Sequence, residues 1–427
     1  MQHRCASTTG GAPGRAPARP GRPVSRRAVT AAGLLAPLAA LLAGCGADQG
    51  STSPRTLRVL DTYTNDPDRT VIGGALDAAA KKVGVTLERV SVAGDSLIQR
   101  VLQQGSSGTL PDILMLDNPD LQQIAATTAL RPFDEVGVPT DGYTEGVTSA
   151  GTYDGRVYGL APTVNTIALF YDVRALDEAG VAPPTTWSEL REAAGALTRG
   201  SRYGLAFCGN ATYEGTWQYL PFFWSNGADE RDIATPEAAA GLDLLAGTVA
   251  DGHASTSVLN WSQADVKDQF VAGRAAMMVN GPWQIPELES VEGLEYAVVT
   301  LPVRDPAGQR PVAPLGGEVW TVPATGDRSK ERLAGRVLAE FLSDESLVSM
   351  AAKRSTVPGR PALIEPFLER RPEMAAFADL VRGARARTAE LGAEWPATAT
   401  ALYTAVQLAV SGQATAQDAL AEAQEYV

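Results

Sequence analysis

The stretch from Gln263 to Trp283 places an indole where it could bind a ligand. The segment Gln263–Gly273 predicts a helix that ends at its glycine, and Ala275–Val279 is a short apolar run typical of a buried strand. The turn residues Asn280-Gly281-Pro282 follow, so Trp283 comes just after the carboxyl end of that strand, where open α/β sheets bind ligands. Its ring offers a flat apolar face and one N–H donor. The alternative is that Trp283 fills the core.

Residues for catalysis are scarce. Once an N-terminal leader is removed, His253 is the only histidine, and no Gly-x-Ser-x-Gly motif accompanies it. A zinc site would have only His253 and Cys208 for nitrogen and sulfur ligands, and no phosphate-binding Gly-rich loop ends in Gly-Lys-Ser/Thr. A glycosidase needs only two carboxylates, and the 49 acidic residues leave that alternative open as a minor one. The sequence therefore favours binding over catalysis, with no cofactor and no metal.

The N-terminus has the order of regions typical of an export signal. Residues 1–27 contain six arginines and no acidic residue, and an apolar run of small residues follows as far as Ala43. Leu-Ala-Gly-Cys45 resembles the lipobox of bacterial lipoproteins. We therefore expect a signal peptide over 1–44, a lipidated Cys45 and a tether over 45–55. Ser25-Arg26-Arg27 resembles a twin-arginine signal, and the export route stays open.

The charge and the cysteines restrict the class of partner. The net charge is -13, and removing the six leader arginines lowers it to -19. This charge argues against nucleic acid and against attraction to anionic lipid. Apart from Cys45, the predicted mature chain holds only Cys208, so we expect no internal disulfide. These features suit an exported protein held at the membrane by its lipid.

The N-terminal part alternates strands with helices. We expect strands at 56–60, 85–90 and 110–116 and helices at 70–82, 96–104 and 121–129. This alternation predicts a parallel sheet with helices on both faces. Polar residues follow two of these strands, and they are Tyr63 and Asn65 after the first and Asp117 and Asn118 after the third.

The later part predicts a second group of elements. Residues 209–217 form an aromatic-rich loop that contains Tyr213, Glu214 and Trp217, and 218–224 form a helix. Further strands are expected at 166–171, 294–301 and 315–322, and long helices at 329–350, 397–410 and 414–427. Of Trp217 and Trp224, at most one is expected to face a ligand.

Several motifs resemble those of one family. Phe270–Trp283 reads Phe-x-x-Gly-x-Ala-Ala-Met-x-x-Asn-Gly-Pro-Trp, and Pro183-Pro-x-Thr-Trp-x-Glu-Leu190 precedes a helix. Leu130-Arg-Pro-Phe-Asp134 is a third motif, although Ala129 stands where a glycine is usual. Together they resemble extracellular solute-binding protein family 1, the maltose-binding-protein-like sugar-binding lipoproteins of ABC importers. The resemblance runs from about residue 56 to the end.

The resemblance implies an α/β two-lobe periplasmic-binding-protein fold of type II. Each lobe would hold a mainly parallel sheet flanked by helices, with the ligand cleft between the lobes. Crossings near residues 169, 301 and 357 would divide the chain into lobe 1 (56–169 and 302–357) and lobe 2 (170–301 and 358–427). The protein would be a monomer whose partners are a carbohydrate, the permease subunits of the importer and, through its lipid, the membrane.

The resemblance also implies a sugar site, because sugars need aromatic faces for their C–H surfaces and polar partners for their hydroxyls. The candidate ligand-binding residues are Trp283, Asp117, Asn118, Tyr213, Glu214, Trp217, Gly317, Glu318, Tyr63, Asn65, Trp395 and Tyr403. No basic cluster is visible among them, which favours a neutral mono- or oligosaccharide. The alternatives are a non-sugar solute such as a polyol phosphate or, from another class, a secreted carbohydrate-active enzyme.

Overall fold

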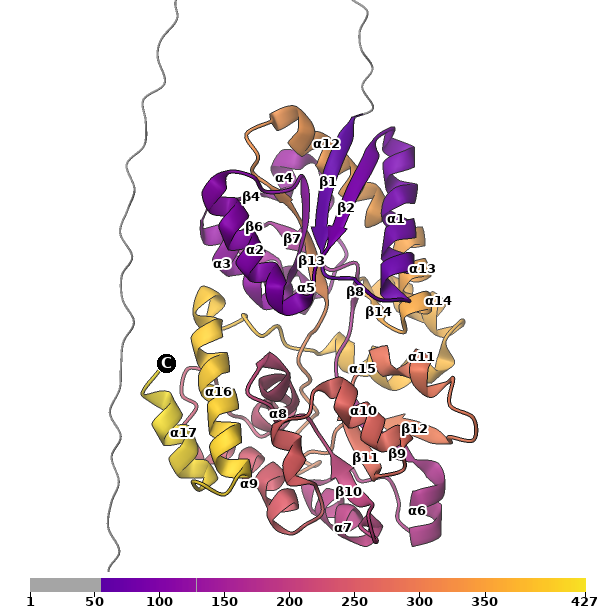
Figure 1. The fold of residues 1–427 in the computed structure, drawn as a ribbon, viewed down its shortest axis with the longest axis vertical. Helices are drawn as coiled ribbons and strands as arrows, with labels where there is room; N and C mark the ends of the chain where they lie inside the picture. The colour runs from indigo at the N-terminus through magenta and orange to yellow at the C-terminus, as the bar shows by residue number, and fades with distance from the viewer. Residues whose placement is uncertain (1–54, 128) are drawn as a thin grey trace, which may run out of the picture. The chain divides into compact units, whose positions relative to one another are not determined.

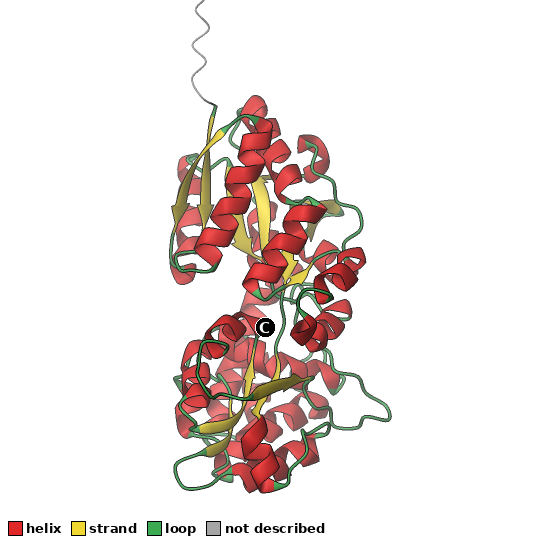
Figure 2. Cartoon of the chain, turned by 90° about the vertical axis from the view of Figure 1, so that its right-hand side faces the viewer, coloured by secondary structure: helices red, strands yellow, loops and turns green. Residues whose placement is uncertain are grey.

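The computed structural model describes residues 55–127 and 129–427, and from residue 55 onward they belong to one compact unit. Two main sheets organise it, each with helices around it, as Figure 1 and Figure 2 show. The signal peptide, Cys45 and nearly all of the tether lie outside the described residues. The predicted α/β fold is confirmed for the described part.

The first sheet has the order β2-β1-β3-β13-β4, and β7 also pairs with β13. Its strands are β1 (Thr56–Asp61), β2 (Thr86–Ser91), β3 (Ile113–Asp117), β4 (Leu130–Arg131), β7 (Gly159–Leu160) and β13 (Glu318–Pro323). The predicted parallel order holds for β2, β1 and β3. β13 instead runs antiparallel to β3, with Glu318 opposite Asp117.

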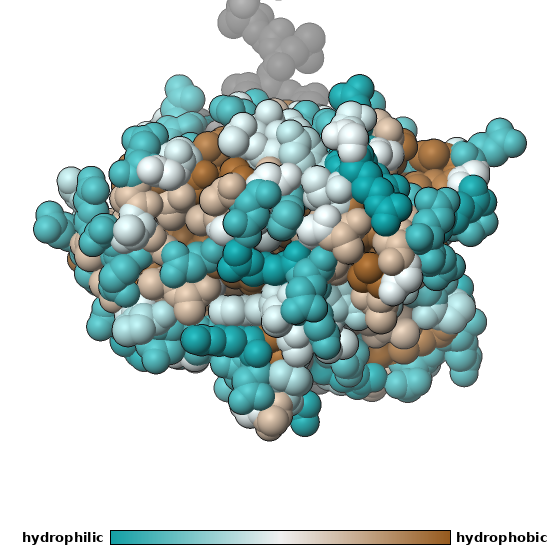
Figure 3. All heavy atoms as spheres, turned by 90° about the horizontal axis from the view of Figure 1, so that it is seen from below, coloured by the Kyte–Doolittle hydropathy of each residue, from teal (hydrophilic) through white to brown (hydrophobic). Residues whose placement is uncertain are grey.

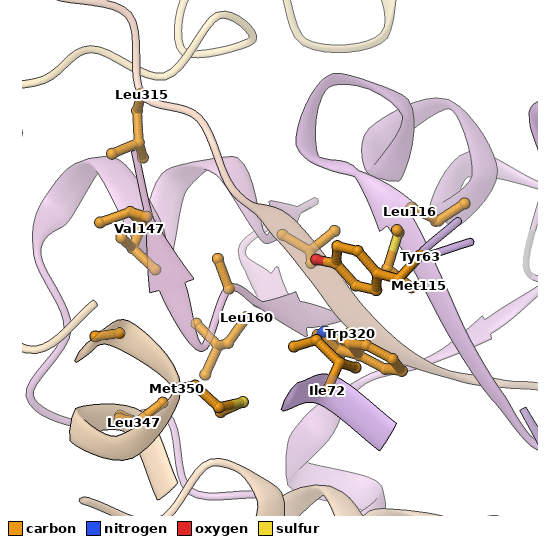
Figure 4. Packing of buried hydrophobic residues seen from close by; sticks show 14 of the residues in the cluster. Tyr63, Ile72, Met115, Leu116, Val147, Leu160, Leu315, Trp320, Leu347 and Met350 are labelled. Carbon is orange, nitrogen blue, oxygen red and sulfur yellow. The ribbon is translucent and has the colours of Figure 1, made fainter. Parts of the chain in front are cut away.

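Four helices cover most of this sheet. They are α1 (Asp68–Val83), α2 (Gly94–Ser107), α12 (Arg328–Phe341) and α13 (Asp344–Arg354). Ile72 and Leu76 of α1 recur at helical spacing and are fully buried. Trp320 of β13 is also fully buried and meets the Phe341 ring edge to face, with 5.0 Å between ring centroids. Figure 4 shows Ile72, Trp320 and Met115 gathered in this core.

The second sheet has the order β10-β11-β9-β12. Its strands are β9 (Ala168–Asp172), β10 (Tyr203–Ala206), β11 (Ala275–Asn280) and β12 (Tyr296–Val299). β11 is buried along its whole length, as its apolar run predicts. β10 and β11 are parallel, whereas β9 is antiparallel to both β11 and β12. The expectation of mainly parallel sheets is therefore wrong in both cases. The chain reaches β9 from the first sheet and reaches β13 from the second sheet. Each of these two strands then pairs antiparallel with a neighbour in the sheet that it joins.

Helices surround the second sheet as well. They are α6 (Val173–Ala179), α7 (Trp187–Leu197), α8 (Tyr213–Ser225), α9 (Pro236–Ala250), α10 (Gln263–Val271), α16 (Trp395–Val410) and α17 (Ala416–Gln424). A capping box starts α7: Thr186 accepts from the Glu189 N–H, and the Glu189 carboxylate accepts from the Thr186 N–H. α16 packs between α8, α9 and α17 and fixes α8 at one side of the sheet.

Extended segments connect the two sheets. β8 (Thr163–Val164) leads into β9, and it pairs with β14 (Val357–Pro358). Asn165 exchanges backbone hydrogen bonds with Gly316, at 3.2 and 2.8 Å. After β14, helices α14 (Ile364–Leu368) and α15 (Ala375–Arg382) pack near β14 before the chain reaches α16. No observation here tests the lobe limits, which stay a prediction.

The short elements complete the fold. They are α3 (Leu121–Ala126), α4 (Phe133–Val136), α5 (Glu145–Ala150), α11 (Ile285–Leu288) and the hairpin of β5 (Thr152–Tyr153) and β6 (Arg156–Val157). Polar and apolar residues are interspersed over the face in Figure 3. Within residues 55–127 and 129–427, every helix is too short or too polar to cross a membrane.

Candidate ligand-binding site

A cavity of about 1050 Å³ opens among the ends of strands from both sheets. The first sheet contributes Asp117, the last residue of β3, and Glu318, the first residue of β13. Because these two residues are register partners in adjacent antiparallel strands, their carboxylates lie at the same edge. The second group of elements contributes Tyr213 of α8 and Trp283 after β11.

Seven of the twelve candidate residues line this cavity. They are Trp283, Asp117, Tyr213, Glu214, Trp217, Gly317 and Glu318. They come from positions up to 201 residues apart, between Asp117 and Glu318, and the two sheets bring them together. This grouping combines aromatic faces with carboxylate acceptors.

The other five candidates do not line the cavity. Asn118 is buried, and its Nδ2 donates to the carbonyls of Leu315 and Gly317, both at 3.1 Å. Asn118 therefore holds the segment that leads into β13. Asn65 is exposed, Trp395 is buried in the second core, and Tyr403 is half-buried on α16.

Tyr63, the remaining one, lies beneath the cavity floor. It is buried, and its hydroxyl donates to Glu318 Oε2 at 2.6 Å. Burial raises the pKa of Tyr63 well above its ordinary value, so it stays a donor at physiological pH. It orients the Glu318 carboxylate and leaves that group in the cavity wall.

Trp283 has its position because of the glycine two residues before it. A Cβ on Gly281 would lie 1.9 Å from the Trp283 ring, so only glycine lets the indole fold back over this backbone. The Asn280 side chain braces the turn, since its Oδ1 accepts from the Gly281 N–H at 3.0 Å and its Nδ2 donates to the Gln263 carbonyl at 2.9 Å. Trp283 is half-buried: it packs against the second core and also lines the cavity.

Tyr213, Glu214 and Trp217 lie on a helix, and the expected loop over 209–217 is therefore wrong beyond Thr212. The Thr212 hydroxyl accepts from the Glu214 N–H and caps α8 at that point. Helical spacing then puts Tyr213 and Trp217 on one face. Trp224 is buried away from the cavity, and its Nε1 donates to Glu230 at 2.9 Å. Of the two tryptophans, Trp217 is the one that lines the cavity.

Two arginines lie in the cavity wall, although the candidate residues selected from the sequence contain no basic cluster. Arg354, at the end of α13, donates to Asp68 at 2.7 Å and lies 3.8 Å from Glu318. Its guanidinium also stacks over the Tyr63 ring, 4.8 Å from the centroid. These partners are up to 291 positions away from Arg354, so no local pattern in the sequence marks it.

The second arginine, Arg387, lies in the segment between α15 and α16. It donates to Asp117 at 2.8 Å and to the Asn118 side-chain oxygen at 3.1 Å. Its guanidinium also lies 4.6 Å from the centre of the Trp217 ring. Arg387 therefore contacts both walls of the cavity at once. The sequence Arg382-Gly-Ala-Arg385-Ala-Arg387 is the only signal that could have drawn attention to it.

Asp120 is a further lining residue that the sequence analysis did not select. Burial, and next the charge of Asp117, raise the pKa of Asp120 to about 7, although Arg387 opposes the rise. Among the described residues, its carboxylate has no hydrogen-bond or ion-pair partner within the ordinary distance limits. Asp120 is thus the carboxylate of this wall that is free to meet a ligand.

Comparison with known proteins identifies the type of protein that carries such a cavity. Residues 74–376 match the family model of the bacterial extracellular solute-binding proteins. A binding protein of Brucella abortus (strain 2308) is 28% identical over 300 residues, which cover 65% of this chain and 69% of the relative. The galactooligosaccharide-binding protein of Bacillus subtilis (strain 168) is 24% identical over 328 residues, which cover 73% of this chain and 75% of that relative.

A solved structure shows the same fold. The cyclic alpha-maltosyl-1,6-maltose binding protein of Arthrobacter globiformis superposes with a TM-score of 0.75 at 21% identity. The match covers 88% of this chain and 98% of the other. The fold is therefore that of the two-lobe binding proteins.

Proposed function

The chain belongs to the bacterial extracellular solute-binding proteins, and we propose that it captures a carbohydrate and delivers it to the permease of an ABC importer. The names of relatives and structural neighbours support the sugar, because they include binding proteins for galactooligosaccharides and for cyclic alpha-maltosyl-1,6-maltose. The family places the protein outside the cytoplasm.

One observation carries the proposal: the cavity is lined by aromatic rings together with carboxylates, and these residues come from both groups of elements. A sugar ring has apolar C–H faces, which the half-buried indole of Trp283 can cover. Its hydroxyls need hydrogen-bond acceptors when they leave water, and Asp117 and Glu318 supply them. The volume of about 1050 Å³ is enough for more than one sugar ring.

The same arrangement supports capture by hinge closure. Asp117 and Glu318 belong to the first sheet, whereas Trp283 follows a strand of the second. A ligand that contacts both sides stabilises a closed state, because an open state offers only part of the contacts. The paired segments at Asn165 and Gly316 are candidates for the hinge. The proposed lobes remain 56–169 with 302–357, and 170–301 with 358–427.

We propose that the ligand is released unchanged. His253 packs near Gly195, outside the cavity lining, so it is not available as a base there. The five carboxylates in the lining outnumber the two arginines, which disfavours a phosphorylated polyol. A secreted carbohydrate-active enzyme is the remaining alternative, and analysis of the ligand after incubation decides it.

Anchoring at the membrane forms the last part of the proposal. Cleavage before Cys45 and acylation of that residue would leave a short tether before β1, which begins at Thr56. Two or more acyl chains on one cysteine give stable anchoring. The proposed location is the outer side of the cell membrane, next to the permease.

A thermal-shift screen against mono- and oligosaccharides tests the proposed function. A ligand that binds only the folded state raises the melting temperature, by an amount that grows with its concentration. We expect at least one sugar to raise it in a saturable way, while sugar phosphates of the same size do not. If no sugar shifts the transition and a phosphorylated solute does, the proposed ligand class is wrong.

A further inference from the structure

The charges that line the cavity do not balance. Five carboxylates and two guanidinium groups line it. Both cations are already paired, Arg354 with Asp68 at 2.7 Å and Arg387 with Asp117 at 2.8 Å. Arg354 also lies 3.8 Å from Glu318. The cavity therefore has an excess of negative charge and no unpaired positive group among its described lining residues.

The remaining carboxylates differ in their partners. Glu318 accepts the Tyr63 hydroxyl at 2.6 Å. Glu214 accepts the Gln263 N–H at 3.1 Å and the Cys208 thiol at 3.7 Å. Within the described residues, Asp120 alone among these carboxylates accepts no hydrogen bond and faces no paired cation within 4.0 Å. Asp120 comes three residues after Asp117, at the end of the short 3-10 helix Asn118–Asp120.

Aromatic side chains of the second group of elements line the same cavity as Asp120. Tyr213 and Asp120 both line the cavity, and Arg387 connects Asp117, three residues before Asp120, with Trp217, one helical turn after Tyr213. Burial raises the pKa of Tyr213 to about 12, and the Asp120 charge adds to the rise. Tyr213 is half-buried and Trp283 is half-buried, so part of each ring stays accessible. A carboxylate next to accessible aromatic faces is an arrangement that favours a cation over a neutral group.

Arg387 is a cation that already lies between a carboxylate and an aromatic ring in this cavity. Its guanidinium lies 4.6 Å from the centre of the Trp217 ring and donates to Asp117. Asp120 with Tyr213 repeats the pair of carboxylate and aromatic ring, but no cation of the described residues forms an ion pair with Asp120. Arg387, which is paired with Asp117, only lowers the pKa of both groups from nearby. A ligand that brings a cation would complete the second pair.

We propose that the cavity selects a sugar that carries a protonated amine, with Asp120 as the counter-charge and Tyr213 as the aromatic face beside it. This inference rests on the proposed function, because it names the class of sugar that the same cavity binds. It predicts a preference for amino sugars over neutral sugars, and over sugars whose amine is acetylated and uncharged.

Calorimetric titration with matched sugars tests the proposal. The probes are glucose, galactose and mannose, their amino and N-acetylamino counterparts, and short oligosaccharides of glucosamine and N-acetylglucosamine, all at neutral pH. The wild-type protein should bind an amino sugar at least about ten-fold more tightly than its neutral and acetylated counterparts. Added salt should weaken the binding of the amino sugar and leave the neutral sugar nearly unaffected.

Two variants assign the effect to Asp120. Asp120→Asn should reduce the preference to less than about three-fold, and Asp120→Ser should do the same if the first variant folds poorly. Asp77→Asn is the matched control, because Asp77 is an exposed carboxylate on α1 with no partner in the cavity. It should keep the wild-type preference.

Each outcome has a distinct meaning. If the wild type binds a neutral sugar as tightly as its amino counterpart, the inference is wrong and the proposed function stands. A preference for the amine that survives in folded Asp120→Asn would remove Asp120 from the account. If no sugar of any series binds while the protein is folded, the proposed function is contradicted as well.

Discussion

The Arg387 guanidinium donates to the Asp117 carboxylate at 2.8 Å, although 270 positions separate the two residues. Asp117 ends a strand of the first sheet, and Arg387 also stacks on Trp217, which belongs to α8 beside the second sheet. A single side chain thus contacts both walls of the cavity. This contact makes Arg387 a positioning residue for the site as well as a link between the two groups of elements.

Replacing Arg387 with Met should affect both stability and binding. The change leaves Asp117, which is 46% exposed, without its cation and uncovers the Trp217 ring, so we expect the free energy of unfolding to fall by about 1–3 kcal/mol. It also removes the charge that lowers the pKa of Asp120, so that pKa should rise further. Urea unfolding measures the change in stability. Ligand titration measures the change in binding, which should weaken because Asp117 and Trp217 both lose the side chain that positions them.

Arg382→Met is the matched control for that experiment. Arg382 belongs to the same run of arginines, but its ion pair with Glu365 is on the surface, where such pairs contribute roughly 0–1 kcal/mol. The control should bind and unfold like the wild type. Equal behaviour of the two variants would show that Arg387 has no special role.

Removing the Trp283 ring should weaken binding without unfolding the protein. The indole is half-buried and only packs against the second core, so Trp283→Ala should lower the free energy of unfolding but leave the protein folded. The lost stacking should reduce the affinity for a sugar by roughly 1–3 kcal/mol. Trp283→Phe keeps a flat apolar face and should recover part of that loss. A folded Trp283→Ala variant with wild-type affinity would exclude this ring from the site.

The stability of the ligand-free protein should depend on Asp120 and on pH. Because the pKa of Asp120 is raised to about 7 in the folded state, the folded protein holds this proton more tightly than the unfolded chain does. The protonated Asp120 carboxyl therefore stabilises the folded protein fully below pH ~4, and this stabilisation is lost as the pH rises through 7. Asp120→Asn should therefore be more stable than the wild type at pH 8, by on the order of 1–2 kcal/mol after solvent screening.

Thermal unfolding of wild type and Asp120→Asn from pH 4 to pH 8 checks this expectation. The melting temperatures should differ little at the acid end and diverge toward the alkaline end. Asp77→Asn should follow the wild type at every pH, because Asp77 is exposed. A constant difference across the range would mean that the Asp120 carboxyl titrates as it does in the unfolded chain.

Gly316 should be hard to replace because of its place between the two sheets. A Cβ there would lie 2.0 Å from the Asn165 side-chain oxygen and 2.8 Å from the Trp217 ring. Gly316→Ala must therefore push apart the paired segments or displace Trp217, and we expect it to weaken both stability and ligand binding. Gly308→Ala, in an exposed turn with 3.8 Å of room, is the control and should be neutral. A Gly316→Ala variant that binds normally would exclude a role for this position in the hinge.

Cys45→Ala tests the proposed anchor. If acylation of Cys45 holds the protein at the membrane, the variant should move to the soluble fraction after cell lysis, or be secreted. Fractionation and immunoblotting measure this directly. Unchanged membrane association of the variant would contradict the anchor and leave the binding site untouched.

Local patterns in the sequence predicted the helices and strands whose limits depend on neighbouring residues. The apolar run Ala275–Val279 is β11 except for its last residue, and the glycine at 281 lets Trp283 fold toward the cavity. The start of α8 was not predicted because Gly209 precedes it and Gly215 lies in its first turn, and glycines are typical of loops, although Thr212 is its cap. The long helix expected within 329–350 is α12, and a second helix, α13, begins after Ser343 with Asp344 and Glu345 in its first turn.

The parts of the site that depend on distant contacts could not be predicted. Nothing near Arg354 in the sequence indicates that Asp68 and Tyr63 surround it. In the same way, Asp120 reads as part of an Asn-Pro-Asp turn, and its free carboxylate is evident only when the opposite wall is in place. Family motifs therefore identified aromatic positions such as Trp283, whereas the balance of charge in the cavity required the structure.

Titration of the purified protein with the sugar selected by the thermal-shift screen tests the central claim most directly. Isothermal calorimetry should give one binding site, with a dissociation constant near the micromolar range, which corresponds to about 8 kcal/mol. The sugar recovered afterwards should be chemically unchanged, and Trp283→Ala should weaken the same isotherm by about ten-fold or more. A sugar that is cleaved during the titration, or an isotherm that Trp283→Ala leaves intact, would contradict the account of this cavity as a carbohydrate-capture site.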